Sequence, residues 1–205
     1  MKGYAKSLYE FIEGNKIQFI IPVYQRNYDW LVENCDQLLN DLVKLSHSNR
    51  QSHFFGSIVT SSADCSYDRL VIDGQQRLTT ISLLLLAGIK AVKDGAIEIS
   101  DQKRIEEAYE AFLNAKFCNT ERKIKLVPID HDKIAYDKIY NNEELLDENS
   151  KLTRNYRHFY DKLTRKPQVL SFDQLLDAIE RLQIISIELD KDDDAQLIFE
   201  SLNST

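Results

Sequence analysis

The stretch Leu70-Val71-Ile72-Asp73-Gly74-Gln75-Gln76-Arg77-Leu78-Thr79-Thr80 joins a short apolar run to a long one through a glycine. Residues 69–73 have the length and composition of a buried strand. Gly74 lets the chain turn and leaves its backbone exposed. Residues 79–92 are almost all apolar, which is typical of a central helix that is buried on every side. We therefore expect a strand at 69–73 that leads directly into a buried helix at 76–93.

The turn between this strand and this helix is a candidate anion site. A helix N-terminus presents unpaired amides and the positive end of the helix dipole, so anions bind there. Asp73 would hold a metal ion bound to a phosphate. The chain has no Walker A sequence, and the alternative is that Arg77 only pairs with Asp73 to hold the turn. The side chains that would cradle a phosphate are Gln75, Gln76, Arg77, Thr79 and Thr80.

A second cluster is Ile21-Pro22-Val23-Tyr24-Gln25-Arg26-Asn27-Tyr28-Asp29-Trp30, at the end of a strand predicted over 16–23. Arg26, beside Gln25, would grip a phosphate through two parallel hydrogen bonds. Aromatic side chains next to it would stack on a base, or would simply cover an edge of the core. These aromatic residues are Tyr24, Tyr28 and Trp30.

The final helix, which acidic residues at 192–194 should begin, carries Phe199-Glu200-Ser201-Leu202-Asn203. Glu200 and Asn203 are three residues apart and share a face that could meet a ligand. The alternative is an ordinary amphipathic helix. Because the sequence ends in this helix without a cap, we expect the chain to be the N-terminal piece of a longer protein.

The segment 151–166 is basic although the whole protein is acidic. It has a single acid, Asp161, and interleaved aromatic residues, so it is a candidate nucleic-acid contact. The alternative is a solvated helix face with its aromatic residues in the core. The cations of this segment are Lys151, Arg154, Arg157, Lys162, Arg165 and Lys166.

The remaining pattern predicts an α+β fold, a small mixed sheet with a helical second half. The expected strands of the sheet are 17–23, 54–61, 69–73 and 184–189, and a further short strand is expected at 123–127. Helices are expected at 4–13, 130–141, 151–165 and 172–182. The expected parts are a motif-bearing α/β part at 1–95, a mostly helical insertion at 96–183, and a return strand and helix at 184–205.

Composition narrows the class of protein. The chain has 205 residues, 43% of them hydrophobic and 29% charged, so it has enough apolar material for a core. A net charge of −7 argues against a domain whose entire surface clamps nucleic acid. The three cysteines form no CxxC pair, which excludes a zinc ribbon. We find no signal peptide or membrane span, and expect a soluble cytoplasmic protein without a membrane partner.

Four blocks, IPVYQRNYDW, FFGSIV, LVIDGQQRLTTI and FESLNST, occur in this order over residues 19–205. Together they resemble the N-terminal domain of the GmrSD-type modification-dependent restriction endonucleases, which is related to the ParB/sulfiredoxin fold. The resemblance implies that IPVYQR corresponds to the first ParB-like box. It likewise implies that DGQQR corresponds to the box that holds nucleotide phosphates.

The resemblance also implies function. It implies binding and hydrolysis of a nucleoside triphosphate with Mg²⁺, in a system that restricts modified double-stranded DNA through an HNH-type nuclease domain. No HNH signature occurs in this chain. The alternative is a non-catalytic DNA-recognition module that uses the same groove and the basic segment. The implied catalytic residues are Asp73, Arg77 and Glu200, and the implied nucleotide contacts are Tyr24, Gln25, Arg26, Gly74, Gln75, Gln76, Thr79, Thr80 and Asn203.

Overall fold

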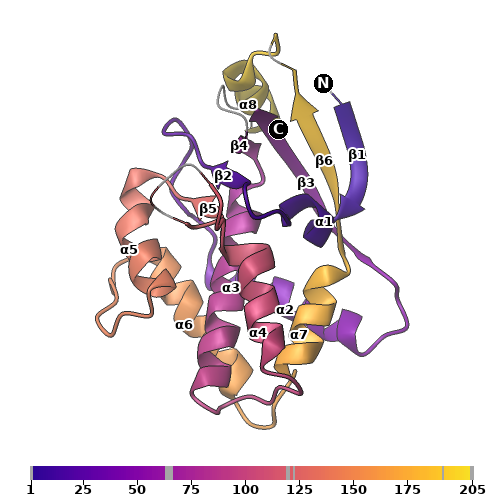
Figure 1. The fold of residues 1–205 in the computed structure, drawn as a ribbon, viewed down its shortest axis with the longest axis vertical. Coiled ribbons are helices and arrows are strands. Elements are labelled where there is room, and N and C mark those ends of the chain that lie inside the picture. Colours follow the sequence, from indigo (N-terminus) through magenta and orange to yellow (C-terminus); the bar gives the residue numbers. More distant parts are fainter. Residues whose placement is uncertain (1, 63–66, 119–120, 122, 191, 204–205) are drawn as a thin grey trace.

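A mixed sheet of six strands organises the chain (Figure 1). The computed structural model describes residues 2–62, 67–118, 121, 123–190 and 192–203. The described strands are β1 (Lys2–Ser7), β2 (Gln18–Ile20), β3 (His53–Ser62), β4 (Asp68–Asp73), β5 (Leu126–Val127) and β6 (Leu182–Leu189). The described helices are α1 (Leu8–Ile12), α2 (Val32–Ser46), α3 (Gln75–Lys93), α4 (Lys103–Ala108), the π-helix η1 (Tyr109–Leu113), α5 (Asp130–Tyr140), α6 (Lys151–Thr164), α7 (Phe172–Glu180) and α8 (Ala195–Asn203).

The strand order is β1-β6-β3-β4-β2-β5. β3 pairs antiparallel with β4 and parallel with β6, and β4 pairs parallel with β2. The sheet is therefore mixed, and most of the helices follow β4 in the sequence. The predicted α+β class, with a small mixed sheet and a helical second half, is confirmed.

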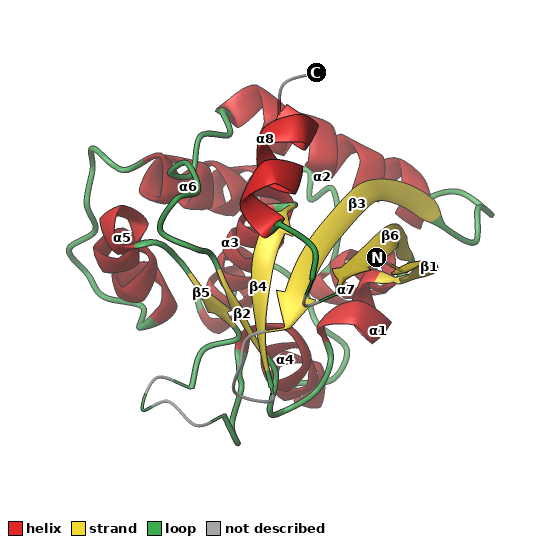
Figure 2. Cartoon of the chain, turned by 90° about the horizontal axis from the view of Figure 1, so that it is seen from above, coloured by secondary structure: helices red, strands yellow, loops and turns green. Residues whose placement is uncertain are grey.

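The two faces of the sheet are covered differently because side chains alternate along each strand. Val59 and Ile72 point to one face, where α8 covers a small apolar cluster. Ile58 and Val71 point to the other face and join the main core. Figure 2 shows α8 lying over β4, while α2, α3 and α7 lie on the other side of the sheet in Figure 1. β4 and its C-terminal turn are therefore held between two helical layers.

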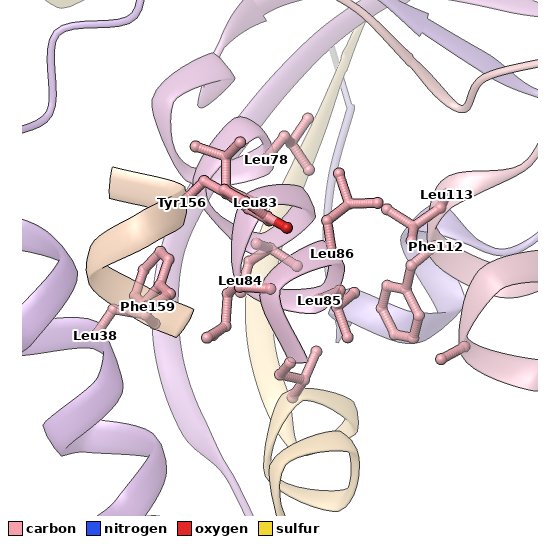
Figure 3. Close-up of a cluster of buried hydrophobic side chains, with 14 of the residues drawn as sticks. Leu38, Leu78, Leu83, Leu84, Leu85, Leu86, Phe112, Leu113, Tyr156 and Phe159 are labelled. Atoms are coloured by element: carbon pink, nitrogen blue, oxygen red, sulfur yellow. The ribbon is translucent and has the colours of Figure 1, made fainter. Parts of the chain in front are cut away.

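α3 is the centre of the main core. Its run from Leu83 to Leu86 is buried, so the helix is surrounded by apolar side chains on all sides. Figure 3 shows these leucines between Phe159 of α6 on one side and Phe112 of η1 on the other. The predicted buried helix at 76–93 is confirmed, and its rigid packing fixes the position of its N-terminus. Within the described residues, no helix is both long enough and apolar enough to cross a bilayer.

The N-terminal segment differs from the prediction. A helix was expected over 4–13, but β1 occupies Lys2–Ser7 and pairs antiparallel with β6, and only Leu8–Ile12 is helical. Ser7 and Glu10 form a capping box that marks the true start of α1. By contrast, the short strand expected at 123–127 is confirmed: β5 lies within it and pairs with β2 at the sheet edge.

Candidate functional site

The N-terminus of α3 is an uncapped helix end at the carboxyl end of β4. Asp73 is the last residue of β4, and Gly74 is the N-cap with a φ of 95°. Among the described residues, no side chain caps the helix. The first backbone hydrogen bond of the helix is the one that the Leu78 amide donates to the Gly74 carbonyl, at 3.1 Å. The amides of residues 75–77 precede it, so they are the free donors of this helix end.

Gly74 is required at the turn for two reasons. Its φ lies in the left-handed region, which favours glycine. A Cβ atom there would also lie 2.9 Å from Ile58 Cγ1 and 3.2 Å from the Ser57 carbonyl oxygen. The backbone of β3 thus passes directly against the turn, which fixes where the helix amides point.

Arg77 lies in the first turn of α3, and its side chain extends to β3 and to the end of β4. Its Nη1 donates to the Ser57 carbonyl at 3.2 Å and lies 3.8 Å from Asp73 Oδ2. Both side chains of this ion pair are about a third exposed, at 32% and 29%. An ion pair with this exposure contributes about 0–1 kcal/mol to stability, so the pairing alone gives little reason for an arginine here.

The turn opens into a small cleft of about 100 Å³. Three separate segments meet there: the loop after β2, the β4–α3 turn and helix α8. The aromatic ring of Tyr24 packs 6.1 Å from that of Phe199, which further ties the first segment to the third. The residues that line the cleft are Arg26, Trp30, Asp73, Gly74, Gln75, Gln76, Arg77 and Phe199.

Two buried glutamines beside this turn have an incomplete set of hydrogen bonds. Gln25 Nε2 donates to the Ile72 carbonyl at 2.8 Å, and Gln75 Nε2 lies 3.5 Å from the Arg26 carbonyl. The Oε1 atom of each side chain is buried and has no donor among the described residues. Buried acceptors are usually satisfied, so these two atoms indicate donors that the described residues do not supply.

Gln76 holds the loop 27–30 against α3. Its Oε1 accepts from the amides of Asp29 at 2.8 Å and Trp30 at 3.3 Å, and its Nε2 donates to the Asn27 carbonyl at 3.1 Å. Both polar atoms of the side chain are therefore bonded to this loop. Gln76 contributes its backbone amide to the helix end, and its side chain positions Trp30.

Thr79 and Thr80 are buried rather than facing the cleft, at 3% and 0% exposure. The Thr80 hydroxyl donates to the Gln76 carbonyl at 2.7 Å and also bonds to the Tyr28 hydroxyl at 2.7 Å.

Burial raises the pKa of Tyr28 above its ordinary value. Burial likewise raises the pKa of Asp132, whose carboxylate accepts from the Tyr28 amide at 2.7 Å, a bond that opposes that rise. Thr80 and Asp132 therefore hold the loop 25–30 in place through their hydrogen bonds to Tyr28.

Comparison with known families identifies the chain. The GmrSD restriction endonuclease N-terminal domain matches residues 8–205. The chain belongs to this family. No curated protein matches it significantly. Restriction endonucleases act on DNA, so membership in the GmrSD family indicates DNA and a nuclease domain as the partners of this domain.

The described part of the GmrSD-type domain has no cluster of side chains that would form a metal site by itself. No group of three histidines, cysteines or acids that could hold a metal ion occurs among its described residues. Asp73 is the acid that lines the cleft. Mg²⁺ is commonly held by one or two carboxylates together with substrate phosphates and water. The residues present therefore fit a Mg²⁺ ion that arrives with a phosphate, and do not fit a resident metal.

Besides the buried Thr79 and Thr80, four predicted residues of the GmrSD-type domain are not among the residues that line the cleft: Tyr24, Gln25, Glu200 and Asn203. Glu200 is exposed and accepts a hydrogen bond from Gln196 Nε2 at 3.2 Å. The Asn203 side chain lies outside the described residues. Phe199 of the same helix packs against the small apolar cluster of Val59 and Ile72, and it also lines the cleft.

The basic segment of the GmrSD-type domain forms α6 and the turn after it, and its cations fall into two groups. Half of them pair with acids: Lys151 with Asp29, Arg157 with Glu148, and Lys162 with Asp36. The hydrogen bond from Lys151 lowers the pKa of Asp29. In the described chain, the other half form no ion pair, and these are Arg154, Arg165 and Lys166. Arg154 and Arg157 are exposed on α6, and Arg165 is the exposed C-cap residue that follows it; we refer to these three arginines as the basic stripe.

A larger cavity of about 930 Å³ lies elsewhere in this GmrSD-type domain, between α3, α4, η1, α5 and α6. Its lining includes Leu86, Ile89, Tyr109, Tyr140 and Tyr156, and no residue of the four sequence blocks. The small cleft therefore remains the candidate site, because the helix end, two arginines and the motif carboxylate converge there.

Proposed function

We propose that the cleft binds the phosphates of a nucleoside triphosphate, and that the domain hydrolyses this nucleotide to regulate DNA restriction by a partner nuclease domain of the HNH type. The observation that carries the proposal is the convergence of the free amides of α3 with Arg26 and Arg77 on one small cleft. Helix N-termini and arginines are the groups that proteins use to bind phosphate.

The size of the cleft limits what enters it. Pockets for whole cofactors and drug-sized ligands have volumes of about 300–1,000 Å³, whereas this cleft has about 100 Å³. It matches a phosphoryl group rather than a nucleotide. The ribose and base would then lie over the rim, where the rings of Tyr24 and Trp30 are available for stacking.

The unpaired glutamine oxygens support a ligand with donors as well as negative charge. Gln75 Oε1 is a buried acceptor in the lining of the cleft. Ribose hydroxyls, exocyclic base amines and bound water all carry such donors. A bare anion would leave this atom unsatisfied, which favours a nucleotide or a hydrated phosphate.

Hydrolysis needs little beyond positioning and charge. Water forms a new bond to the terminal phosphorus while the bond to the bridging oxygen breaks; the nucleoside diphosphate leaves with that electron pair, inorganic phosphate forms, and a proton of the water passes to solvent. Arg77 and Arg26 would stabilise the charge that develops on the phosphoryl oxygens. Asp73 would hold Mg²⁺ or orient the water, and Glu200 on α8 is the outer candidate for that second role. A bound Mg²⁺ would supply Lewis-acid neutralisation of the phosphate charge.

The test is a titration of the 205-residue chain with ATP, GTP, CTP and UTP, each with Mg²⁺, followed by thermal shift and by release of inorganic phosphate. Binding raises the melting temperature in proportion to the logarithm of ligand concentration over Kd. We expect at least one nucleotide to raise it. No shift with any of the four at millimolar concentration would refute the proposal.

A second candidate function is a DNA-recognition module that works without nucleotide. The specific observation that favours it is the basic stripe of Arg154, Arg157 and Arg165. Labelled modified and unmodified duplexes, titrated with and without nucleotide, distinguish the two. Duplex binding in the absence of any nucleotide shift would favour this second function.

A further inference from the structure

Helix α6 is connected to the cleft through one buried side chain, Asn155. This residue is 1% exposed, in the middle of the helix that carries the basic stripe. Its Nδ2 donates to the Trp30 carbonyl at 2.9 Å and to the Tyr28 hydroxyl at 3.0 Å. Trp30 lines the cleft. The helix that faces DNA in the second candidate function is thus bonded to the wall of the proposed phosphate site.

The same contacts continue into the first turns of α3. The Tyr28 hydroxyl bonds to Thr80 Oγ1, which donates to the Gln76 carbonyl. The Gln76 side chain in turn holds the amides of Asp29 and Trp30. A continuous set of hydrogen bonds therefore runs from Asn155 to the helix end at which phosphate would bind. Buried networks of this kind hold their members in one geometry when they are satisfied.

A second, exposed contact joins the same two elements. Lys151, one turn before Asn155 on α6, pairs with Asp29 of the loop 27–30, with side-chain exposures of 39% and 56%. A DNA phosphate that binds Lys151 would compete with Asp29 for it. Asn155, by contrast, is buried and stays bonded to the loop, so a displacement of α6 would be carried to Trp30.

We propose that Asn155 is a positioning residue for the phosphate cleft, and that through it the cleft and the basic stripe of α6 are energetically coupled. The inference rests on the proposed nucleotide binding. By linkage, nucleotide in the cleft then changes DNA affinity by the same factor by which DNA changes nucleotide affinity. Couplings between distinct sites typically amount to about 5–150-fold, and we expect the wild-type chain to show at least about fivefold.

The test compares Asn155→Leu, which keeps similar bulk but removes both donors, with two variants on the same helix. Thr153→Val is the matched control, because Thr153 is equally buried at 1% exposure and its Oγ1 has no partner among the described residues. Leu163→Ala, two turns further along α6 and fully buried, is the control for lost stability. Asn155→Ser, which keeps one donor, is the conservative variant should Asn155→Leu fail to fold.

The readouts are the Kd for the nucleotide that binds best, with and without a DNA duplex, and the change in Trp30 fluorescence on binding. Asn155→Leu should weaken nucleotide binding about tenfold and bring the coupling factor close to one, and Asn155→Ser should lie between it and wild type. Thr153→Val should resemble wild type, and Leu163→Ala should keep the coupling at its lower melting temperature.

Three outcomes overturn the inference and are distinguishable. If wild type binds nucleotide but Asn155→Leu binds and couples as Leu163→Ala does, Asn155 is only structural. If wild type binds both nucleotide and DNA without coupling, the connection carries no energy. If wild type binds no nucleotide at all, the proposed function fails, and the inference fails with it.

Discussion

A Cβ atom at Gly56 would lie 2.7 Å from Arg77 Nε and 3.0 Å from Arg77 Cζ. The Arg77 guanidinium therefore packs directly on the backbone of β3. Gly56 has a φ of 118° and lies at a register shift, where Phe54 and Gly56 pair with consecutive residues of β6. The glycine of the FFGSIV block is thus explained by an arginine of the DGQQR block, which lies in a different element of the chain.

Gly56→Ala should displace Arg77 and weaken nucleotide binding. The methyl group of the alanine would clash with the Arg77 guanidinium. An alanine with the positive φ of this position also costs roughly 1–3 kcal/mol in backbone strain. Gly95→Ala is the matched control, because Gly95 also has a positive φ, 68°, but nothing lies within 4 Å of the added Cβ. Both variants should melt at lower temperature, and only Gly56→Ala should lose affinity in a titration. Equal affinities would show that Arg77 does not need this space.

Charge reversal at Arg154, Arg157 and Arg165 should weaken DNA binding and flatten its salt dependence. Each DNA phosphate that the variant no longer neutralises makes the slope of log K against log salt shallower by about 0.9. The triple glutamate variant at Lys2, Lys44 and Lys103 changes net charge equally but leaves the stripe intact. A salt slope in the stripe variant equal to that of this control would mean that the stripe is only a solvated face.

Lys125 should contribute to the free energy of unfolding an amount that rises with pH above about 8. Its side chain is fully buried and Nζ donates to the Gly14 carbonyl at 2.6 Å. Burial lowers the pKa of Lys125 to about 8, although Glu110, Cys118 and Glu13 oppose this shift. Between that value and the ordinary lysine pKa of about 10.4, the unfolded chain binds more protons than the folded one, so stability increases with pH.

Lys125→Met should remove this contribution, and the difference between wild type and variant in denaturant unfolding, at several pH values below about 9.5, measures it. The difference is needed because burial raises the pKa of Cys35, so this thiol ionises first in the unfolded chain and lowers the stability of both proteins in the same range. The upper limit matters because burial raises the pKa of Tyr28, Tyr140 and Tyr156. Those tyrosines ionise first in the unfolded chain, near about pH 10, and so lower stability there. Parallel curves for the two proteins would contradict the assignment.

Local sequence signals predicted the centre of the fold. β4, Gly74 and α3 follow directly from an apolar run, a turn residue and a second apolar run. The strand β1 was missed because Lys2–Ser7 is mostly polar and exposed, and because its partner β6 lies at the far end of the chain. The helical spacing of Tyr4, Leu8 and Ile12 then favoured a helix that begins too early. Ser7 and Glu10, a capping box, were the signal that would have placed its start.

The candidate site was predictable only in part. Asp73, Gly74, Gln75, Arg77 and Arg26 were expected together, and the structure brings all of them to one cleft. Their roles in binding and catalysis remain predictions.

Other features of the site required the structure. The contact of Gly56 with Arg77, and that of Asn155 with Trp30, depend on chain segments that are remote in sequence. Neither residue has a local pattern that reveals its contact. Gln76 lines the cleft as expected, and its side chain also holds the loop 27–30, a contact that the sequence spacing does not reveal.

In the proposed function, the small cleft at the β4–α3 turn binds nucleotide phosphate through Arg77. Trp30 is the single tryptophan of the chain and lines this cleft, so its fluorescence reports occupancy directly. The measurement is a fluorescence titration of wild type, Arg77→Ala and Arg77→Lys with each nucleoside triphosphate and Mg²⁺, with pyrophosphate as a probe that does not absorb.

We expect wild type to bind, and Arg77→Ala to bind about tenfold to a hundredfold more weakly, because charge-assisted hydrogen bonds are each worth roughly 1.5–3 kcal/mol. Arg77→Lys should recover only part of this affinity, since an ammonium cannot form the two-pronged contact. The melting temperature of Arg77→Ala without ligand should stay close to that of wild type. A wild-type protein whose Trp30 fluorescence ignores every nucleotide, together with a large drop in the stability of Arg77→Ala, would contradict the account and leave Arg77 as the partner of Asp73 that holds the turn.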